Sequence, residues 1–188
     1  MSTTAPTRTP VSGTATAVRR RKPFLLDLYD TAVGKKYAMA ISGIALMGFV
    51  LFHMIGNLKM YLGEADLNEY AEFLKKLLYP LAPKESVLWI LRLGLIGMLA
   101  LHLHAAWSLT VLNRKARPVR YQSARDYQEA SLASRSMRLS GIVVLLFIVW
   151  HLLDLTFGVV NTVGTDGVFV REEVYANVVR SFERWPVA

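Results

Sequence analysis

Three long apolar stretches, separated by polar segments, dominate the pattern of this chain. They lie at about residues 37–58, 86–112 and 138–160. Each reaches the roughly 20 residues that a helix needs to cross a bilayer. The first stretch contains no charged residue and the second contains only Arg92, while the third, apart from its first residue, contains only Asp154. The pattern therefore predicts an all-α protein, a polytopic bundle with three transmembrane helices.

Two shorter segments, at about 66–79 and 172–185, have apolar residues on one helical face only. These residues are Leu67, Tyr70, Ala71 and Leu74 in the first segment and Val174, Val178, Phe182 and Trp185 in the second. Asp66 and Glu69 resemble a capping pair at the start of the first helix, and Pro80 follows its end. We expect both segments to lie at the membrane interface, as lids over one end of the bundle.

The chain begins with a basic segment, residues 1–23, that is expected to be disordered. Its first 18 residues are mostly small or polar and show no helical or strand period. The basic cluster Arg19–Lys22 is interpreted as an orientation anchor and a lipid contact. Residues 24–188 then form the membrane anchor, which begins with a short surface helix over about 25–33.

The net charge of +8 is distributed in alternating blocks. Residues 1–36 and 113–138 each hold seven Lys or Arg against two acidic residues, whereas 59–85 holds four against five and 161–188 holds three against four. This alternation follows the positive-inside rule and predicts that the N-terminus and the 113–138 loop are cytoplasmic. A nucleic-acid partner would need one contiguous basic face, so we expect none.

All four histidines of the chain lie inside the apolar stretches, where an imidazole is costly and usually serves a proton path or a metal. His53 and His151 lie on helices that run in the same direction, and both fall in the outer half of the membrane. We therefore expect them to be the two axial ligands of one haem b, held between the helices. His102 lies in the inner half and has no partner at its level, so a second haem b would need a ligand from outside this chain.

His102 and His104 are about 200° apart around a helix, so both cannot face the same iron. For each single histidine, the alternative to a ligand is a hydrogen bond between helices. The chain has no cysteine, which excludes a disulfide, a covalently attached haem and a complete iron–sulfur site made by this chain alone. Haem held by histidine nitrogens needs no cysteine.

Arg92 and Asp154 each lie six residues from the outer end of their span, at the level of His53 and His151. A haem propionate at this depth requires a cation, and Arg92 is the cation embedded there, so we predict that Arg92 contacts the propionate. The alternative is an ion pair between Arg92 and Asp154 without a cofactor.

Several short motifs, taken in order, resemble the cytochrome b membrane anchor of succinate dehydrogenase and fumarate reductase, in the b558 family. The resemblance covers roughly residues 24–185, and its histidines are spaced by 49 and 49 residues. The motifs are Phe52-His53-Met54-Ile55-Gly56-Asn57, Leu101-His102, Asn113-Arg114-Lys115-Ala116-Arg117-Pro118 with Tyr121, and Trp150-His151.

The resemblance implies five spans and two haems b, of which this chain covers the first three spans. It implies that His53 and His151 hold the haem far from the catalytic subunits and that His102, preferred over His104, holds the nearer one. The missing helices would come from a longer chain or from a second polypeptide. Electrons would pass from an iron–sulfur subunit and a flavoprotein subunit, on the cytoplasmic side of a bacterial cell membrane, to menaquinone or another quinone.

In this interpretation the chain is an electron-transfer subunit of the respiratory chain and the tricarboxylic acid cycle, and it has no succinate site of its own. The quinone site cannot be assigned to residues. The basic residues Arg114, Arg117 and Arg120 would hold the iron–sulfur subunit or, alternatively, lipid headgroups. Three other interpretations stay open. They are a haem b anchor of another respiratory dehydrogenase, a transporter component with a proton path through the histidines, Arg92 and Asp154, and a Rieske-type cluster completed by cysteines of another chain.

Overall fold

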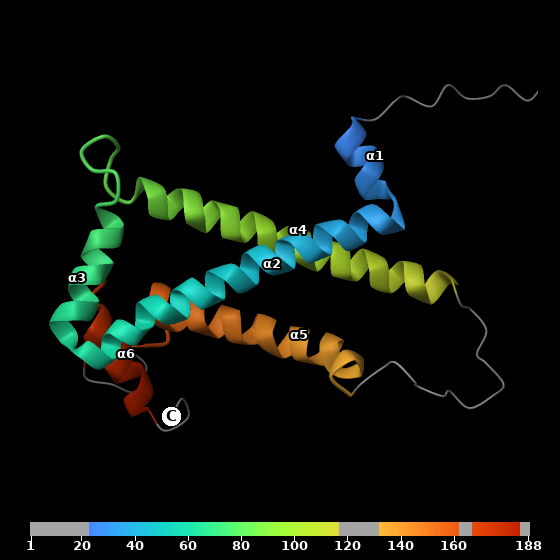
Figure 1. Cartoon of the computed structure of the whole chain (residues 1–188). Coiled ribbons are helices and arrows are strands. Elements are labelled where there is room, and N and C mark those ends of the chain that lie inside the picture. Colours follow the sequence, from blue (N-terminus) through green and yellow to red (C-terminus); the bar gives the residue numbers. More distant parts are fainter. Residues whose placement is uncertain (1–22, 117–131, 162–166, 185–188) are drawn as a thin grey trace, which may run out of the picture.

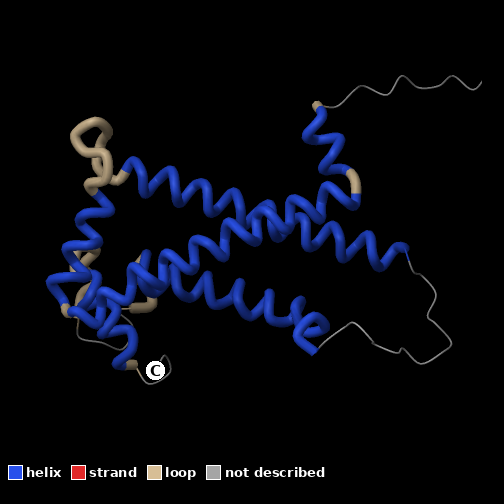
Figure 2. Tube along the Cα trace, in the orientation of Figure 1, coloured by secondary structure: helices blue, strands red, loops and turns tan. Residues whose placement is uncertain are grey.

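The computed structural model describes residues 23–116, 132–161 and 167–184 (Figure 1). The predicted disorder of the N-terminal segment therefore lies outside the described residues. All regular secondary structure in the described part is helical (Figure 2), which confirms the all-α prediction.

Three long helices form the body of the protein: α2 (Ala32–Asn57), α4 (Ser86–Ala116) and α5 (Leu132–His151). A short 3₁₀ helix, η1 (Leu58–Leu62), continues α2, and a π-helix, η2 (Leu152–Thr156), continues α5. All three long helices are long and apolar enough to cross a membrane.

Most large apolar side chains on these helices are exposed, and the buried hydrophobic residues among those described are Leu67, Ala105 and Leu109. An exposed apolar surface of this extent is incompatible with water but matches lipid. The chain is therefore a membrane protein.

The short helices gather at the two ends of the long ones (Figure 1). Helices α3 (Glu64–Lys75) and α6 (Val174–Glu183) lie with η1 and η2 at one end, which we call the lid end. Helix α1 (Phe24–Asp30) lies at the other end, beside the start of α2. We call this the basic end.

The sharp boundary between α1 and α2 is made by Thr31. Its hydroxyl accepts a hydrogen bond from the backbone N–H of Gly34 (2.9 Å) and so caps α2. The same hydroxyl donates to the carbonyl of Leu28 in α1 (2.7 Å). One residue therefore ends the surface helix at Asp30, earlier than the sequence pattern indicated, and begins the first span at Ala32.

Helix α3 starts at a glycine rather than at the expected capping pair. Gly63 has a φ of 116°, a left-handed conformation that favours glycine, and α3 has no side-chain cap. Asp66 lies within the first turn instead, where its charge still favours the helix N-terminus. The helix ends at Lys75, five residues before Pro80, and the chain continues in turns from Lys76.

Helix α6 buries its polar side, which the apolar spacing did not predict. Asn177 and Ser181 are buried, whereas Phe182 is 55% exposed. Its N-terminus is capped across the lid by Asn68 of α3, whose side-chain oxygen accepts a hydrogen bond from the backbone N–H of Tyr175 (3.1 Å). Phe182 is left exposed, and the buried polar residues fasten the lid to the bundle.

The long helices do not pack equally. Helices α2 and α4 cross along an extensive seam that includes the buried Ser42, Ala105 and Leu109. Helix α5 meets α2 near the lid end, where His53 and His151 lie together, and diverges from it toward the basic end (Figure 1). The contact between α2 and α5 therefore lies near the lid end, whereas α2 and α4 cross near the middle of their lengths (Figure 1).

A substitution at Gly158 tests how firmly the segment after η2 is fixed. Gly158 has a φ of 72°, and the ring of Phe169 occupies the place of an added Cβ atom. We expect Gly158→Val to lower the free energy of unfolding by about 1–3 kcal/mol from backbone strain alone, with a further loss from the displaced ring. The thermal unfolding midpoint in detergent measures this.

The matched control is Gly48→Ala in α2, where no atom lies within 4 Å of an added Cβ. Its midpoint should not fall, since alanine favours a helix over glycine. Equal midpoints for Gly158→Val and the parent protein would show that the turn after η2 adapts freely.

Candidate functional site: a histidine pair beside a buried ion pair

The imidazole rings of His53 and His151 lie edge-on to each other between α2 and α5. Their centroids are 5.8 Å apart and their planes are nearly perpendicular, at 89°. A metal–imidazole bond is about 2 Å long, so two rings on opposite sides of one metal have nitrogens about 4 Å apart and centroids somewhat farther apart. The spacing of this pair is therefore compatible with two axial ligands of one iron.

An aromatic ring supports each histidine from the preceding turn of its own helix. Phe49 stacks on His53 with centroids 5.2 Å apart, and Phe147 stacks on His151 with centroids 5.6 Å apart. Both stacks have an interplanar angle of 25°. The two phenylalanines restrict the rotation of the imidazoles and keep the surroundings of the pair apolar.

Helix α5 changes to a π-helix directly after His151. The change is marked by the hydrogen bond from the N–H of Phe157 to the carbonyl of Leu152, five residues earlier (2.9 Å). Such π-turns are rare and occur frequently at functional sites. This one carries Asp154, so it sets the direction of the charged side chain nearest in sequence to the pair.

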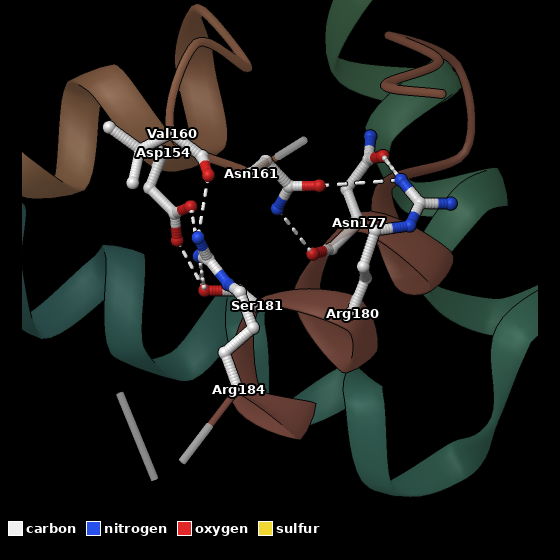
Figure 3. Close-up of polar contacts among 7 residues, drawn as sticks. All are labelled: Asp154, Val160, Asn161, Asn177, Arg180, Ser181 and Arg184. Atoms are coloured by element: carbon white, nitrogen blue, oxygen red, sulfur yellow. Dashed lines mark hydrogen bonds and ion pairs between the residues drawn. The ribbon is translucent and has the colours of Figure 1, made fainter. Parts of the chain in front are cut away.

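Asp154 is buried and pairs with Arg184 of the segment that ends α6 (Figure 3). Nη2 of Arg184 lies 2.6 Å from Oδ1 of Asp154, and the Ser181 hydroxyl donates to Oδ2. Nη1 of Arg184 also donates to the carbonyl of Val160 (2.5 Å). Both carboxylate oxygens are thus satisfied, as a charge buried in an apolar region requires.

A second set of polar contacts, centred on Arg180, lies beside this ion pair (Figure 3). Nη1 of Arg180 donates to the side-chain oxygens of Asn161 (3.3 Å) and Asn177 (3.2 Å) and to the carbonyl of Val168 (3.0 Å). The Asn161 amide donates in turn to the carbonyl of Asn177 (2.9 Å). Arg180 thus ties α6 to the loops around it without touching Asp154.

Arg92 does not form the ion pair with Asp154 that the sequence left open as an alternative. Its guanidinium lies 3.9 Å from Glu85 and 5.1 Å from the ring centroid of Trp89, and its side chain is 45% exposed. The predicted contact between Arg92 and a haem propionate stays a prediction. Asp154 pairs with Arg184 instead, because the lid folds back over the end of α5.

Arg184 was not among the site residues predicted from the sequence; it lies 30 residues after Asp154, in an amphipathic segment assigned to the interface. One signal could have pointed to it. A carboxylate embedded in an apolar helix needs a cation, and the following polar segment returns to the end of the same helix. Ser181, one turn before Arg184, would have fallen on the same face.

His102 faces α2 at a second level of the bundle. Its Nδ1 lies 3.2 Å from the carbonyl oxygen of Met39 and 3.2 Å from the Ser42 hydroxyl. A carbonyl only accepts hydrogen bonds, so Nδ1 of His102 is the donor in its contact with Met39. Gly43 makes room for this ring, since an added Cβ would lie 3.3 Å from Cε1 of His102.

This arrangement of His102 resembles that of metal-ligating histidines, whose second nitrogen usually donates to a carbonyl or carboxylate. The same contact also fits the alternative interpretation, in which His102 only forms a hydrogen bond between two helices. Ser42 lies eleven residues before His53 on α2, so the two levels are separated by about 16 Å along the helix axis. No group of three or more metal-ligating side chains occurs in the described part of the chain.

His104 faces a different neighbour, as its position around the helix predicted. Its Nδ1 lies 2.5 Å from the hydroxyl of Tyr29 in α1, and the two rings stack with centroids 5.7 Å apart. Lys35 of α2 stabilises the end of α1, because its Nζ donates to the carbonyls of Tyr29 (3.1 Å) and Asp30 (3.0 Å). His104 therefore fastens α1 to α4 at the basic end.

Comparison of the chain with family models, with curated proteins and with solved structures yields no match. The assignment of a function therefore rests on the chain itself: three membrane helices, a histidine pair between two of them, and a buried ion pair beside it.

Proposed function

We propose that this chain is a membrane-anchor cytochrome b subunit of a succinate:quinone oxidoreductase. The observation that carries the proposal is the pairing of His53 and His151 across α2 and α5, at a distance compatible with two ligands of one iron. A haem b bound there supplies reversible one-electron transfer. The protein would orient the imidazoles through the rings of Phe49 and Phe147.

A second haem b, held through Nε2 of His102, would take its other ligand from a helix outside the described residues. The polarised Nδ1–H of His102 supports this role. With His102 nearer the basic end and the histidine pair nearer the lid end, the two haems would conduct electrons along the bundle axis.

The basic end is proposed as the cytoplasmic side of a bacterial cell membrane and as the docking side for an iron–sulfur subunit and a flavoprotein subunit. The support comes from the basic excess of residues 1–36 and 113–138 and from the positive-inside rule. Electrons would leave to menaquinone or another quinone. Arg117 and Arg120 of the proposed docking loop lie outside the described residues, whereas Arg114 lies in the last turn of α4.

A different function, as a proton-conducting transporter component, is favoured by the buried carboxylate of Asp154. Ionisable groups inside a membrane are often parts of proton relays. Arg184 weighs against this role, because the two carboxylate oxygens of Asp154 are already engaged by Arg184 and Ser181.

The proposed function is tested by the absorbance spectrum of the full chain, produced with adequate haem supply and purified in mild detergent. We expect the narrow reduced-state bands of a low-spin haem b with two histidine ligands. In membranes that also contain the catalytic subunits, succinate should reduce this haem. Reduction by hydrogen or formate instead would assign the chain to another dehydrogenase. A protein without haem absorbance would contradict the proposal, and proton uptake by liposomes would then test the transporter function.

A further inference from the structure

The guanidinium of Arg184 has one buried N–H group that no described residue satisfies. Its Nη2 donates to Asp154 and its Nη1 to the carbonyl of Val160, but Nε, though buried, has no hydrogen-bond partner. A buried donor without a partner costs about 1–3 kcal/mol, and more on a charged group. An unsatisfied buried donor of this kind needs an explanation. One explanation is a bound group that supplies the missing acceptor.

The position of this donor restricts what the acceptor can be. Asp154 follows His151 by three residues, so the ion pair lies on the lid side of the histidine pair, roughly one helical turn or about 5 Å along the axis. A haem held between His53 and His151 has two carboxylate side chains, the propionates. Their charge favours the direction of the membrane surface over the apolar interior. At the lid end, that direction leads to Arg184.

We propose that Arg184 binds a propionate of the haem through its free Nε–H edge, while Asp154 and Val160 hold the guanidinium in position. This inference rests on the proposed function. Arginine suits the task because its planar fork can engage two carboxylates at once, one on each edge, without losing its charge.

Two other cations could take this role, and both are placed less favourably. Arg92 is 45% exposed and faces Glu85 and Trp89, whereas the side chain of Arg184 is 12% exposed. Lys59 lies over the ring of Tyr70, with Nζ 5.7 Å from the ring centroid. Only Arg184 combines burial, a fixed guanidinium and an unused donor among these three.

The test compares haem midpoint potentials in the full chain. Arg184→Gln should shift the potential to lower values and weaken haem retention during gel filtration, because loss of the positive charge favours the oxidised, more positive haem. Arg184→Lys should shift it less. The control is Arg180→Gln, which removes hydrogen bonds from the same helix but no contact with Asp154, and it should leave the potential unchanged.

A double variant separates direct binding from charge balance. In Arg184→Gln/Asp154→Asn both charges of the pair are removed. If Arg184 binds the propionate, haem retention stays weakened in the double variant, and if it only neutralises Asp154, retention returns to the parental value and the inference is wrong. Equal potentials for Arg184→Gln and Arg180→Gln would also overturn it. A parent protein without any haem would instead overturn the proposed function itself, and this inference with it.

Discussion

Replacing either His53 or His151 with alanine is expected to remove the haem at the lid end completely. Each histidine would supply one of two axial bonds, and the aromatic neighbours Phe49 and Phe147 offer no ligand atom to replace it. The measurement is the ratio of haem to protein in the purified variants, together with the reduced-state spectrum. Both single variants should lose the same haem, and the double variant should lose no more.

His104→Ala is the matched control, because it removes a histidine from a span and breaks its hydrogen bond to Tyr29 and the stacking of the two rings. Its haem content should equal that of the parent protein. His102→Ala should leave the haem at the lid end in place. Full haem content in both His53→Ala and His151→Ala would show that the pairing of the rings has another purpose.

Breaking the buried ion pair is expected to be the most destabilising single change in the lid. Asp154→Ala leaves the charge of Arg184 buried without its partner, and such a loss costs about 3–5 kcal/mol. The free energy of unfolding in detergent should fall by this amount. Because the pair is one of the contacts that attach α6, protease should also cleave between α6 and η2 sooner than in the parent protein.

The control for this experiment is Glu72→Gln on α3, the other lid helix. Glu72 is exposed, and hydrogen bonds from Lys75 and Lys76 lower its pKa. Solvent screens such a surface pair, so the stability should stay close to that of the parent. Asp154→Leu combined with Arg184→Met should recover much of the loss, since a buried ion pair can be replaced by apolar side chains. If Asp154→Ala is as stable as Glu72→Gln, the buried pair does not hold the lid.

Much of the fold was accessible from the sequence because a membrane imposes simple rules. An apolar run of sufficient length with almost no charge has to be a helix, since lipid offers no partner for backbone N–H and C=O groups. The same logic placed His53 and His151 at one depth, because helices of known direction rise by a fixed amount per residue. The structure brings these two rings together as that estimate indicated.

The contacts made by the chain segments outside the membrane could not be predicted from the sequence. Arg184 reaches Asp154 only because the loop after η2 folds back, and neither the π-turn nor the positive φ of Gly158 has a clear signature in the local sequence. The apolar spacing of residues 172–185 predicted an amphipathic helix but not which of its residues are buried against the protein. The polar residues Asn177 and Ser181 then make the protein contacts.

The separation between the two histidine levels has a consequence for the membrane potential. The levels lie about 16 Å apart along α2, roughly half of the 30 Å hydrocarbon core. An electron that passes between them would cross about half of the transmembrane field, worth about 1 kcal/mol for every 100 mV. Under the proposed function, the voltage of an energised membrane would therefore favour one direction of electron flow through this chain and oppose the other.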